Sequence, residues 1–366
     1  MFFKLPFYNP KITIKDFIDF LFLSEPKEKL QKYLQDYFNS KNILLLKSAR
    51  QGIELIFKSL NLVEGDEVIL PSFICPVVPE AVIRAKGKPV FCGIEKNEFN
   101  MDAESARELI SPRTKAIIAA HIFGIPAEIE EFVELTEKNN IFLIEDCAQS
   151  FGAKHKEKLL GTFGDFAVFS FGISKNIGGI GGGFLLCKDT DDFKKIEEIN
   201  LKLANSKFSF KKYLEFLLIL LFLNKYFYWI LGGIIEKYAK MKRDNTSEEE
   251  FILSISSLEA KVAFLKLRKN ENNQKIRNKN AVLYQEELKS LFSFIQIPRD
   301  NYPAFPYLPV LSSQETFNML MAKNIPVRKL EFMNEAEYFL LPLNYFSRQV
   351  KLICAQIKKI LSKHGE

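Results

Sequence analysis

The sequence predicts an α/β fold in which helices cover both faces of a mostly parallel sheet. Short and almost continuously apolar segments recur between residues 43 and 187, and amphipathic helix candidates separate most of them. Strands that are buried on both faces have this composition, whereas a strand with one solvent-exposed face alternates apolar and polar residues. The alternation of such strands with helices is typical of parallel sheets.

Seven segments are strand candidates, and they lie at residues 43–46, 67–71, 88–94, 115–121, 141–146, 166–171 and 183–187. Helices are predicted between the first five of them, at residues 50–62, 76–86, 102–110 and 126–139. The last two strands follow one another without room for a long helix. We therefore expect a seven-stranded sheet whose final strands have short connections.

The chain is expected to have four parts. These are an N-terminal lead-in (1–40), a large domain that holds the sheet (41–190), an apolar helical insertion (191–250) and a C-terminal part (251–366). The lead-in carries a helix candidate at 26–39. The C-terminal part begins with one long helix or two at 257–291 and continues as a small α+β domain, with strands near 294–297 and 307–311 and a final helix at 348–363.

The composition excludes several classes of protein. The chain is 47% hydrophobic and 26% charged, which is ordinary for a globular protein, and its net charge of +6 comes from interleaved charges, so no nucleic-acid partner is expected. Five cysteines without a CxxC pair and only three histidines argue against a disulfide framework and against a metal centre. The N-terminal residues lack the pattern of a signal peptide, and we expect a cytoplasmic protein.

Three polar features follow predicted strands. Ser48 opens a helix as a candidate N-cap, where free backbone N–H groups suit a phosphate, although most helices capped by serine bind nothing. Asp146 ends a buried strand, where a carboxylate is costly unless a positive group meets it. Ser170 ends another strand, and Lys175 follows it in a loop that continues into the glycine-rich stretch 178–183.

The glycine-rich loop does not match the two common nucleotide motifs. A dinucleotide fingerprint would need a glycine where Phe184 stands, and the loop precedes a strand rather than a helix. A Walker loop is excluded because Lys175 precedes the glycines. The remaining interpretations are a plain glycine-rich hairpin with a solvated lysine, or a site that needs an isolated amine.

Pyridoxal 5'-phosphate needs all of these groups at once. Its aldehyde requires an amine such as that of Lys175, its pyridine nitrogen requires a carboxylate such as that of Asp146, and its phosphate requires hydroxyl and N–H groups such as those near Ser48. Together the three features therefore favour this cofactor more than any of them does alone.

With these features, the chain resembles the DegT/DnrJ/EryC1/StrS family of aminotransferases, which have fold type I, depend on pyridoxal 5'-phosphate and act on nucleotide-linked keto sugars. The segments that carry the resemblance are 65–73, 88–94, 112–129, 144–153, 164–165 and 169–176, followed less closely by 256–267 and 340–361. The resemblance implies a fold-type-I transferase that works as a homodimer. It also implies an amino-acid donor, with glutamate as our expectation, and a role in surface polysaccharide or amino-sugar biosynthesis.

The resemblance also implies residue roles. Lys175 would hold the cofactor covalently and later move a proton, Asp146 would pair with the pyridinium nitrogen, and Gln149 would bind the phenolic oxygen. The residues implied for the phosphate are Ser48, Ala49, Arg50 and Ser170. Lys175 also argues against the dehydratase branch of the family, in which a histidine stands at that position.

The chain departs from the family pattern at several positions. Ile252 and Ser254 stand where the family usually has an asparagine and an arginine, and Cys75 stands where an aromatic residue often lies near the cofactor ring. The glycine-rich loop lacks the family's acidic residue, and 304-AFPYLPV-310 lacks its histidine. Two alternatives therefore stay open: another fold-type-I reaction, or a cofactor-binding or membrane-associated homologue with altered or lost transaminase chemistry.

Other residues near these motifs are expected to be structural. His121 ends a strand beside the site, and a loop-shaping role is favoured over a catalytic one. Glu145 is expected to point away from Asp146 as a structural residue. Cys147 and Cys187 are interpreted as small core residues, because no histidine is placed to activate either of them.

The stretch 207–243 is more apolar than the family requires. Its apolar runs are interrupted by Lys225 and by the glycine pair 232–233, which disfavours a membrane-spanning helix. Burial against the protein or its partner subunit is the favoured interpretation, and peripheral contact with a membrane is the second. The protein is therefore expected to be cytoplasmic, and membrane association through this stretch is the alternative.

Overall fold

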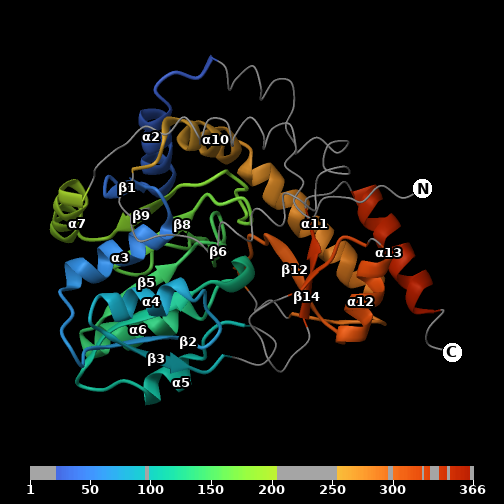
Figure 1. Cartoon of the computed structure of the whole chain (residues 1–366), viewed down its shortest axis with the longest axis horizontal. Helices are drawn as coiled ribbons and strands as arrows, with labels where there is room; N and C mark the ends of the chain where they lie inside the picture. The colour runs from blue at the N-terminus through green and yellow to red at the C-terminus, as the bar shows by residue number, and fades with distance from the viewer. Residues whose placement is uncertain are drawn as a thin grey trace.

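The computed structural model describes residues 22–94, 99–203, 254–295, 300–323, 325–329, 338–343 and 347–362. Two sheets organise this part of the chain, a large one formed by residues before 190 and a smaller one formed by residues after 290 (Figure 1). The helices α10 (Ser257–Leu267) and α11 (Asn270–Leu288) lead from the first to the second. The sequence predicted either one long helix or two helices for this stretch, and the structure has two.

The large sheet has seven strands in the order β1-β9-β8-β5-β4-β2-β3. Their bounds are β1 Ile43–Leu46, β2 Glu67–Pro71, β3 Lys88–Cys92, β4 Thr114–Ala120, β5 Phe142–Asp146, β8 Phe166–Ser170 and β9 Gly183–Cys187. β9 pairs antiparallel with both β1 and β8, and every other pair in this sheet is parallel. The predicted mostly parallel, seven-stranded sheet is confirmed.

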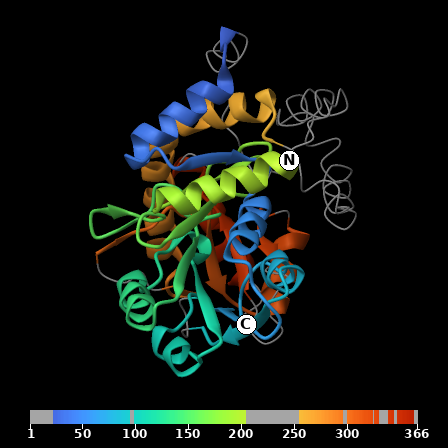
Figure 2. The same cartoon turned by 90° about the vertical axis from the view of Figure 1, so that its left-hand side faces the viewer.

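Helices cover both faces of this sheet, as predicted. On one face lie α3 (Ala49–Leu60), α4 (Val77–Arg84) and α7 (Thr190–Leu203). On the other lie α2 (Pro26–Phe38), α5 (Ala103–Glu108), α6 (Ile129–Asn139) and α10. Figure 2 shows α2 and α10 side by side at the top, with α7 crossing in front of the sheet.

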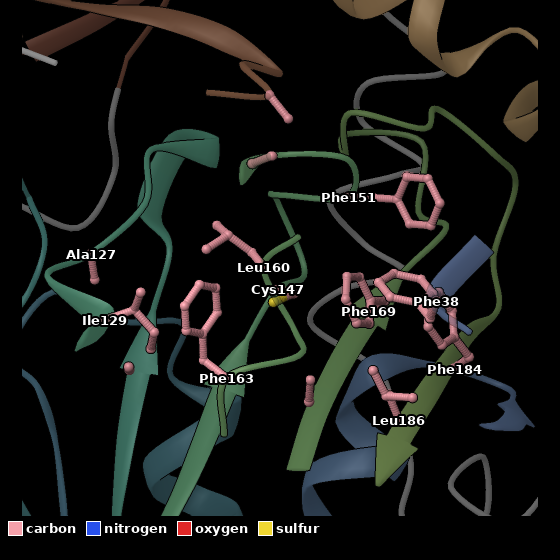
Figure 3. Close-up of a cluster of buried hydrophobic side chains, with 14 of the residues drawn as sticks. Phe38, Ala127, Ile129, Cys147, Phe151, Leu160, Phe163, Phe169, Phe184 and Leu186 are labelled. Carbon is pink, nitrogen blue, oxygen red and sulfur yellow. The ribbon is translucent and has the colours of Figure 1, made fainter. Parts of the chain in front are cut away.

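An aromatic cluster fills the core between the large sheet and the helices α2 and α10. The rings of Phe169 and Phe184, on neighbouring strands, stack with centroids 4.3 Å apart, and Phe38 of α2 packs against both (Figure 3). Phe151 joins them from the loop after β5. This packing fixes the loop after β5, the end of β8 and the start of β9 relative to one another. The loop after β5 carries Gln149, and the end of β8 carries Ser170.

The smaller sheet is antiparallel, in the order β10-β12-β14-β13. Its strands are β10 Ser293–Phe294, β12 Tyr307–Leu311, β13 Arg328–Lys329 and β14 Tyr338–Pro342, and α11, α12 (Gln314–Ala322) and α13 (Ser347–Leu361) accompany it. A third sheet, β11-β6-β7, joins the hairpin of β6 (Lys154–His155) and β7 (Lys158–Leu159) to β11 (Asn301–Tyr302). The small α+β arrangement agrees with the prediction, whereas these short strands were not predicted.

The predicted insertion falls mostly outside the described residues. Residues 204–253 include the apolar stretch 207–243, so its helical structure and its contacts remain predictions, as does the division of the chain into four parts. Among the residues that the structure does describe, no helix combines the length and the apolar character needed to cross a membrane.

Candidate active site

The parallel direction of six strands brings the predicted site residues to one edge of the large sheet. Ser48 follows β1, Asp146 and Ser170 end β5 and β8, and the loop with Cys75 follows β2. Lys175 lies in the loop between β8 and the antiparallel β9, which starts at this edge. The carboxyl ends of parallel strands are where open α/β sheets bind their ligands.

The start of α3 lies against the start of β9. Ser48 is the N-cap of α3, and its hydroxyl accepts a hydrogen bond from Gln51 N–H at 3.3 Å. A Cβ added to Gly183 would lie 3.0 Å from the backbone nitrogen of Ala49, and Gly183 is the register partner of Ser170. Gly183 therefore places the end of β8, with Ser170, close to the first turn of α3, and the N-terminus of a helix is a favourable place for a phosphate.

The first atoms of the Lys175 side chain lie close to Ser170. Its backbone N–H donates to the carbonyl oxygen of Gly172 at 3.0 Å, and Gly172 N–H donates to Ser170 Oγ at 3.2 Å. A Cβ on Gly172 would lie 3.4 Å from Ser170 Oγ and 3.5 Å from Lys175 Cγ. Lys175 is half-buried, and its ammonium forms no ion pair with any described residue.

The end of β5 carries the carboxylate of Asp146, and the loop after it carries the amide of Gln149, whose role the family resemblance implied. Asp146 is half-buried, and its Oδ1 accepts a hydrogen bond from Ala148 N–H at 3.0 Å, while no cation among the described residues meets its carboxylate. Three residues later, Gln149 Oε1 is buried without a hydrogen-bond partner in the described chain. A buried amide oxygen that lacks a partner is costly, which indicates that a bound group completes this position.

Glu145 points away from this site and organises the protein interior. Its carboxylate is fully buried and accepts hydrogen bonds from the N–H groups of Gly161, Phe163 and Gly164 at 2.7, 2.8 and 2.8 Å. The expected structural role of Glu145 is therefore confirmed.

His121 is buried beside Glu145. Its Nδ1 accepts from Ala127 N–H at 3.1 Å, so the proton lies on Nε2, 3.2 Å from Glu145 Oε2. These contacts support the loop-shaping interpretation of His121. The ligand-type atoms of His121, Glu145 and Cys147 lie within 4.8 Å of one another, but internal hydrogen bonds already use the histidine and carboxylate atoms.

The remaining candidate residues differ in their surroundings. Arg50 is half-buried in the first turn of α3, and Cys75 is exposed in the loop after β2, at the same edge as the other site residues. Cys147 and Cys187 are buried core residues, as expected, and burial raises the pKa of the Cys187 thiol to about 12. Neither buried thiol is therefore a nucleophile at neutral pH.

Two contacts at this edge were not predicted from the sequence. The hydroxyl of Tyr307, on β12, donates to the carbonyl oxygen of Ser174, directly before Lys175. Lys47 forms an ion pair with Glu259 of α10. Glu259 also closes a capping box with Ser256, and the spacing in 256-SSLE-259 was the available signal for that part of the contact.

These residues fit pyridoxal 5'-phosphate. Among the described residues, Lys175 has no counter-ion, Asp146 meets no cation, and the buried Oε1 of Gln149 lacks a partner. The serine-capped start of α3 lies close to the end of β8, which carries a second serine. A seven-stranded sheet of this order, with a lysine in the loop before its antiparallel strand, defines the fold-type-I class of pyridoxal-phosphate enzymes.

Comparison with known proteins identifies the family within this class. Residues 20–345 match the model of the DegT/DnrJ/EryC1/StrS aminotransferase family. The chain belongs to this family, and it is an aminotransferase that depends on pyridoxal 5'-phosphate.

The relatives include enzymes with named substrates. The chain is 30% identical over 194 residues to the GDP-perosamine synthase of Escherichia coli O157:H7, and the match covers 50% of this chain and 53% of that protein. It is 37% identical over 150 residues to the UDP-N-acetyl-3-dehydro-alpha-D-glucosamine 3-aminotransferase of Acidithiobacillus ferrooxidans, which covers 41% of each chain. The matched segments thus span about half the length of these relatives, or less.

Solved structures show the same fold over nearly the whole chain. A putative sugar aminotransferase from Streptococcus pneumoniae in its PLP form matches with a TM-score of 0.77 at 17% identity, and the match covers 98% of this chain and 99% of that one.

Proposed function

We propose that this protein transfers an amino group from an amino acid, with glutamate as the favoured donor, to a keto group on a nucleotide-linked sugar. The observation that carries the proposal is the meeting of Lys175, Asp146 and the Ser48 helix start at one edge of the sheet. The names of the relatives support a nucleotide-linked sugar as acceptor. Surface polysaccharide or amino-sugar biosynthesis is the pathway class that this acceptor suggests.

Each residue has a role that follows from its chemistry. Bound pyridoxal 5'-phosphate supplies an electron sink for the carbon that loses or gains a proton. Lys175 would hold the cofactor through its amine and would later carry the proton that moves between the substrate Cα and C4′ of the cofactor. Asp146 keeps a proton on the pyridine nitrogen, and Gln149 hydrogen-bonds the neighbouring oxygen. The groups proposed to bind the phosphate are Ser48, Ala49, Arg50 and Ser170.

The acceptor can be tested directly with the purified protein. UDP-linked and GDP-linked keto sugars are each incubated with the protein, pyridoxal 5'-phosphate and glutamate, and 2-oxoglutarate and the amino sugar are quantified. We expect both products to form in equal amounts with at least one nucleotide-linked keto sugar. Formation of 2-oxoglutarate with simple keto acids as the only acceptors would reject the sugar acceptor and favour another fold-type-I reaction.

Asp146→Asn is expected to reduce turnover by at least ~100-fold, the low end of what positioned proton-holding groups contribute. An amide at this position cannot keep the pyridine nitrogen protonated, so the electron sink is weakened. Steady-state assays with glutamate measure the effect, and Asp36→Asn on the exposed side of α2 is the matched control. Turnover by Asp146→Asn within threefold of the control would show that Asp146 does not have this role.

The second candidate is a cofactor-binding or membrane-associated homologue with altered or lost transaminase chemistry. The observation that favours it is the pair Ile252 and Ser254, where the family usually has an asparagine and an arginine. A protein that binds the cofactor but exchanges no amino group with any amino acid would support this candidate and reject the first.

A homodimer and peripheral membrane contact through 207–243 are also proposals. Sedimentation of the purified protein tests the first, and a monomer at assay concentration would reject it. Flotation with liposomes tests the second. If the protein stays in the soluble fraction at low and high salt, and deletion of residues 212–236 changes nothing, membrane contact is excluded.

A further inference from the structure

Lys47 and Glu259 form a largely buried ion pair beside the proposed phosphate site. Their side chains are 17% and 8% exposed, and they are 212 residues apart in the sequence. Lys47 directly precedes Ser48, the N-cap of α3, while Glu259 lies in the first turn of α10. Burial opposes ionisation of Glu259, but the Lys47 charge and the hydrogen bonds from Lys47 and Ser256 keep the pKa of this carboxyl below its usual range.

The Lys47 backbone ties the same position to two further segments. Its N–H donates to Gln51 Oε1 at 2.9 Å, and Gln51 N–H donates in turn to Ser48 Oγ. Its carbonyl oxygen accepts from Gly182 N–H at 3.1 Å. Lys47 thus contacts the start of α3 and the glycine-rich loop through its backbone, and α10 through its ammonium group.

Glu259 packs directly on the glycine-rich loop. A Cβ added to Gly181, whose φ is +147°, would lie 2.6 Å from Glu259 Oε1. The Glu259 carboxylate also accepts a hydrogen bond from Ser256 N–H at 2.9 Å, which fixes its rotamer through the capping box. Only glycine lets the loop approach the ion pair this closely, so the carboxylate defines where the loop lies.

We propose that the Lys47–Glu259 pair is a positioning device that holds the start of α3 and the glycine-rich loop in register for binding the cofactor phosphate. The inference rests on the proposed phosphate site at Ser48 and Ser170. Because the ammonium is neutralised by the carboxylate, Lys47 acts through geometry and is not the counter-charge of the phosphate. Replacing either partner leaves the other as an unpaired, largely buried charge and loosens the same two segments.

Binding of pyridoxal 5'-phosphate and of pyridoxal, which lacks the phosphate, separates this role from a general contribution to folding. Absorbance titration of the apoprotein gives Kd for both compounds, for the unmodified protein and for Lys47→Met, Glu259→Gln and the double variant. We expect each single variant to raise Kd for pyridoxal 5'-phosphate about tenfold, the equivalent of ~1.4 kcal/mol, while Kd for pyridoxal changes less than twofold. The Kd of the double variant for pyridoxal 5'-phosphate is expected to equal that of the single variant that binds it more weakly, because the two residues act as one unit.

Three further variants serve as controls and as independent tests. Lys47→Arg keeps the charge and the pair, and should bind pyridoxal 5'-phosphate within about twofold of the unmodified protein. Lys358→Met breaks the exposed pair with Glu287 in the smaller part of the chain and should change neither constant. Gly181→Ala displaces Glu259 while both charges remain, so it should raise Kd for pyridoxal 5'-phosphate even if Lys47→Met does not fold.

The outcomes distinguish this inference from the proposed function. An equal loss of affinity for both compounds would show that the ion pair is purely structural. Tighter binding of pyridoxal 5'-phosphate by Glu259→Gln would show that Lys47 is a direct phosphate ligand. Either result overturns the positioning role. Variants that all match the unmodified protein overturn it as well. If the unmodified protein itself binds neither compound, the proposed function fails together with the inference.

Discussion

Lys175→Ala should abolish the covalent attachment of pyridoxal 5'-phosphate and lower amino transfer by roughly 10⁴-fold or more, because the variant loses both the amine and the proton carrier. The half-buried Lys175 has no ion-pair partner among the described residues, and its side chain begins beside Ser170 at the edge of the sheet. The loop between β8 and β9, residues 171–182, contains no second lysine that could take its place.

Borohydride reduction followed by peptide mass spectrometry measures the attachment site. In the unmodified protein, the reduced cofactor should be recovered on the peptide that contains Lys175. Lys188→Ala, on the exposed turn after β9, is the matched control and should retain attachment and activity. Attachment to another lysine in the unmodified protein would move the active site away from the β8–β9 loop.

Glu145→Ala should lower the free energy of unfolding by about 3–5 kcal/mol, the usual cost of breaking a buried charged network. The substitution leaves the N–H groups of Gly161, Phe163 and Gly164 without their acceptor and leaves His121 Nε2 without the carboxylate. The void left by the carboxylate adds to the loss.

Urea unfolding measures this effect, with Glu134→Ala on the exposed face of α6 as the control. Glu145→Gln should cost less than Glu145→Ala, because its amide oxygen still accepts one or two of the N–H groups. A change of less than ~1 kcal/mol for Glu145→Ala, the scale of an ordinary surface substitution, would show that the network does not hold the loop after β7.

The adjacent acids Glu145 and Asp146 thus have different expected phenotypes. Successive side chains of a strand point to opposite faces, and β5 ends on these two residues. Glu145 is buried and satisfied by the backbone, whereas Asp146 is half-buried and meets no cation. Stability should depend mainly on the first residue and catalysis on the second.

The sequence was sufficient for the large sheet because its strands are buried on both faces. A continuous apolar run such as 116–120 fits a strand that is buried on both faces of an α/β layer, and the polar residue that follows it marks the edge where ligands bind. The same reasoning predicted that Asp146 and Ser170 each end a buried strand. The role of Gln149 came only from the resemblance to the family.

Other features could not be predicted because they depend on contacts between distant segments. β6, β11 and β13 are two residues long, so their apolar pattern is too short to detect. Lys47 and Glu259 are separated by 212 residues, and each alone reads as an ordinary charged residue near a helix start. The contact of Tyr307 with Ser174 likewise needs the smaller sheet to lie beside the β8–β9 loop.

The two half-reactions of amino transfer test the central claim most directly. The holoprotein is mixed with glutamate, and the absorbance band of the lysine-bound cofactor is followed until it disappears. A nucleotide-linked keto sugar is then added to the protein freed of glutamate. We predict that glutamate removes the band with release of one 2-oxoglutarate per site, and that the keto sugar restores the band as the amino sugar forms. A band that no amino acid can discharge would contradict the account.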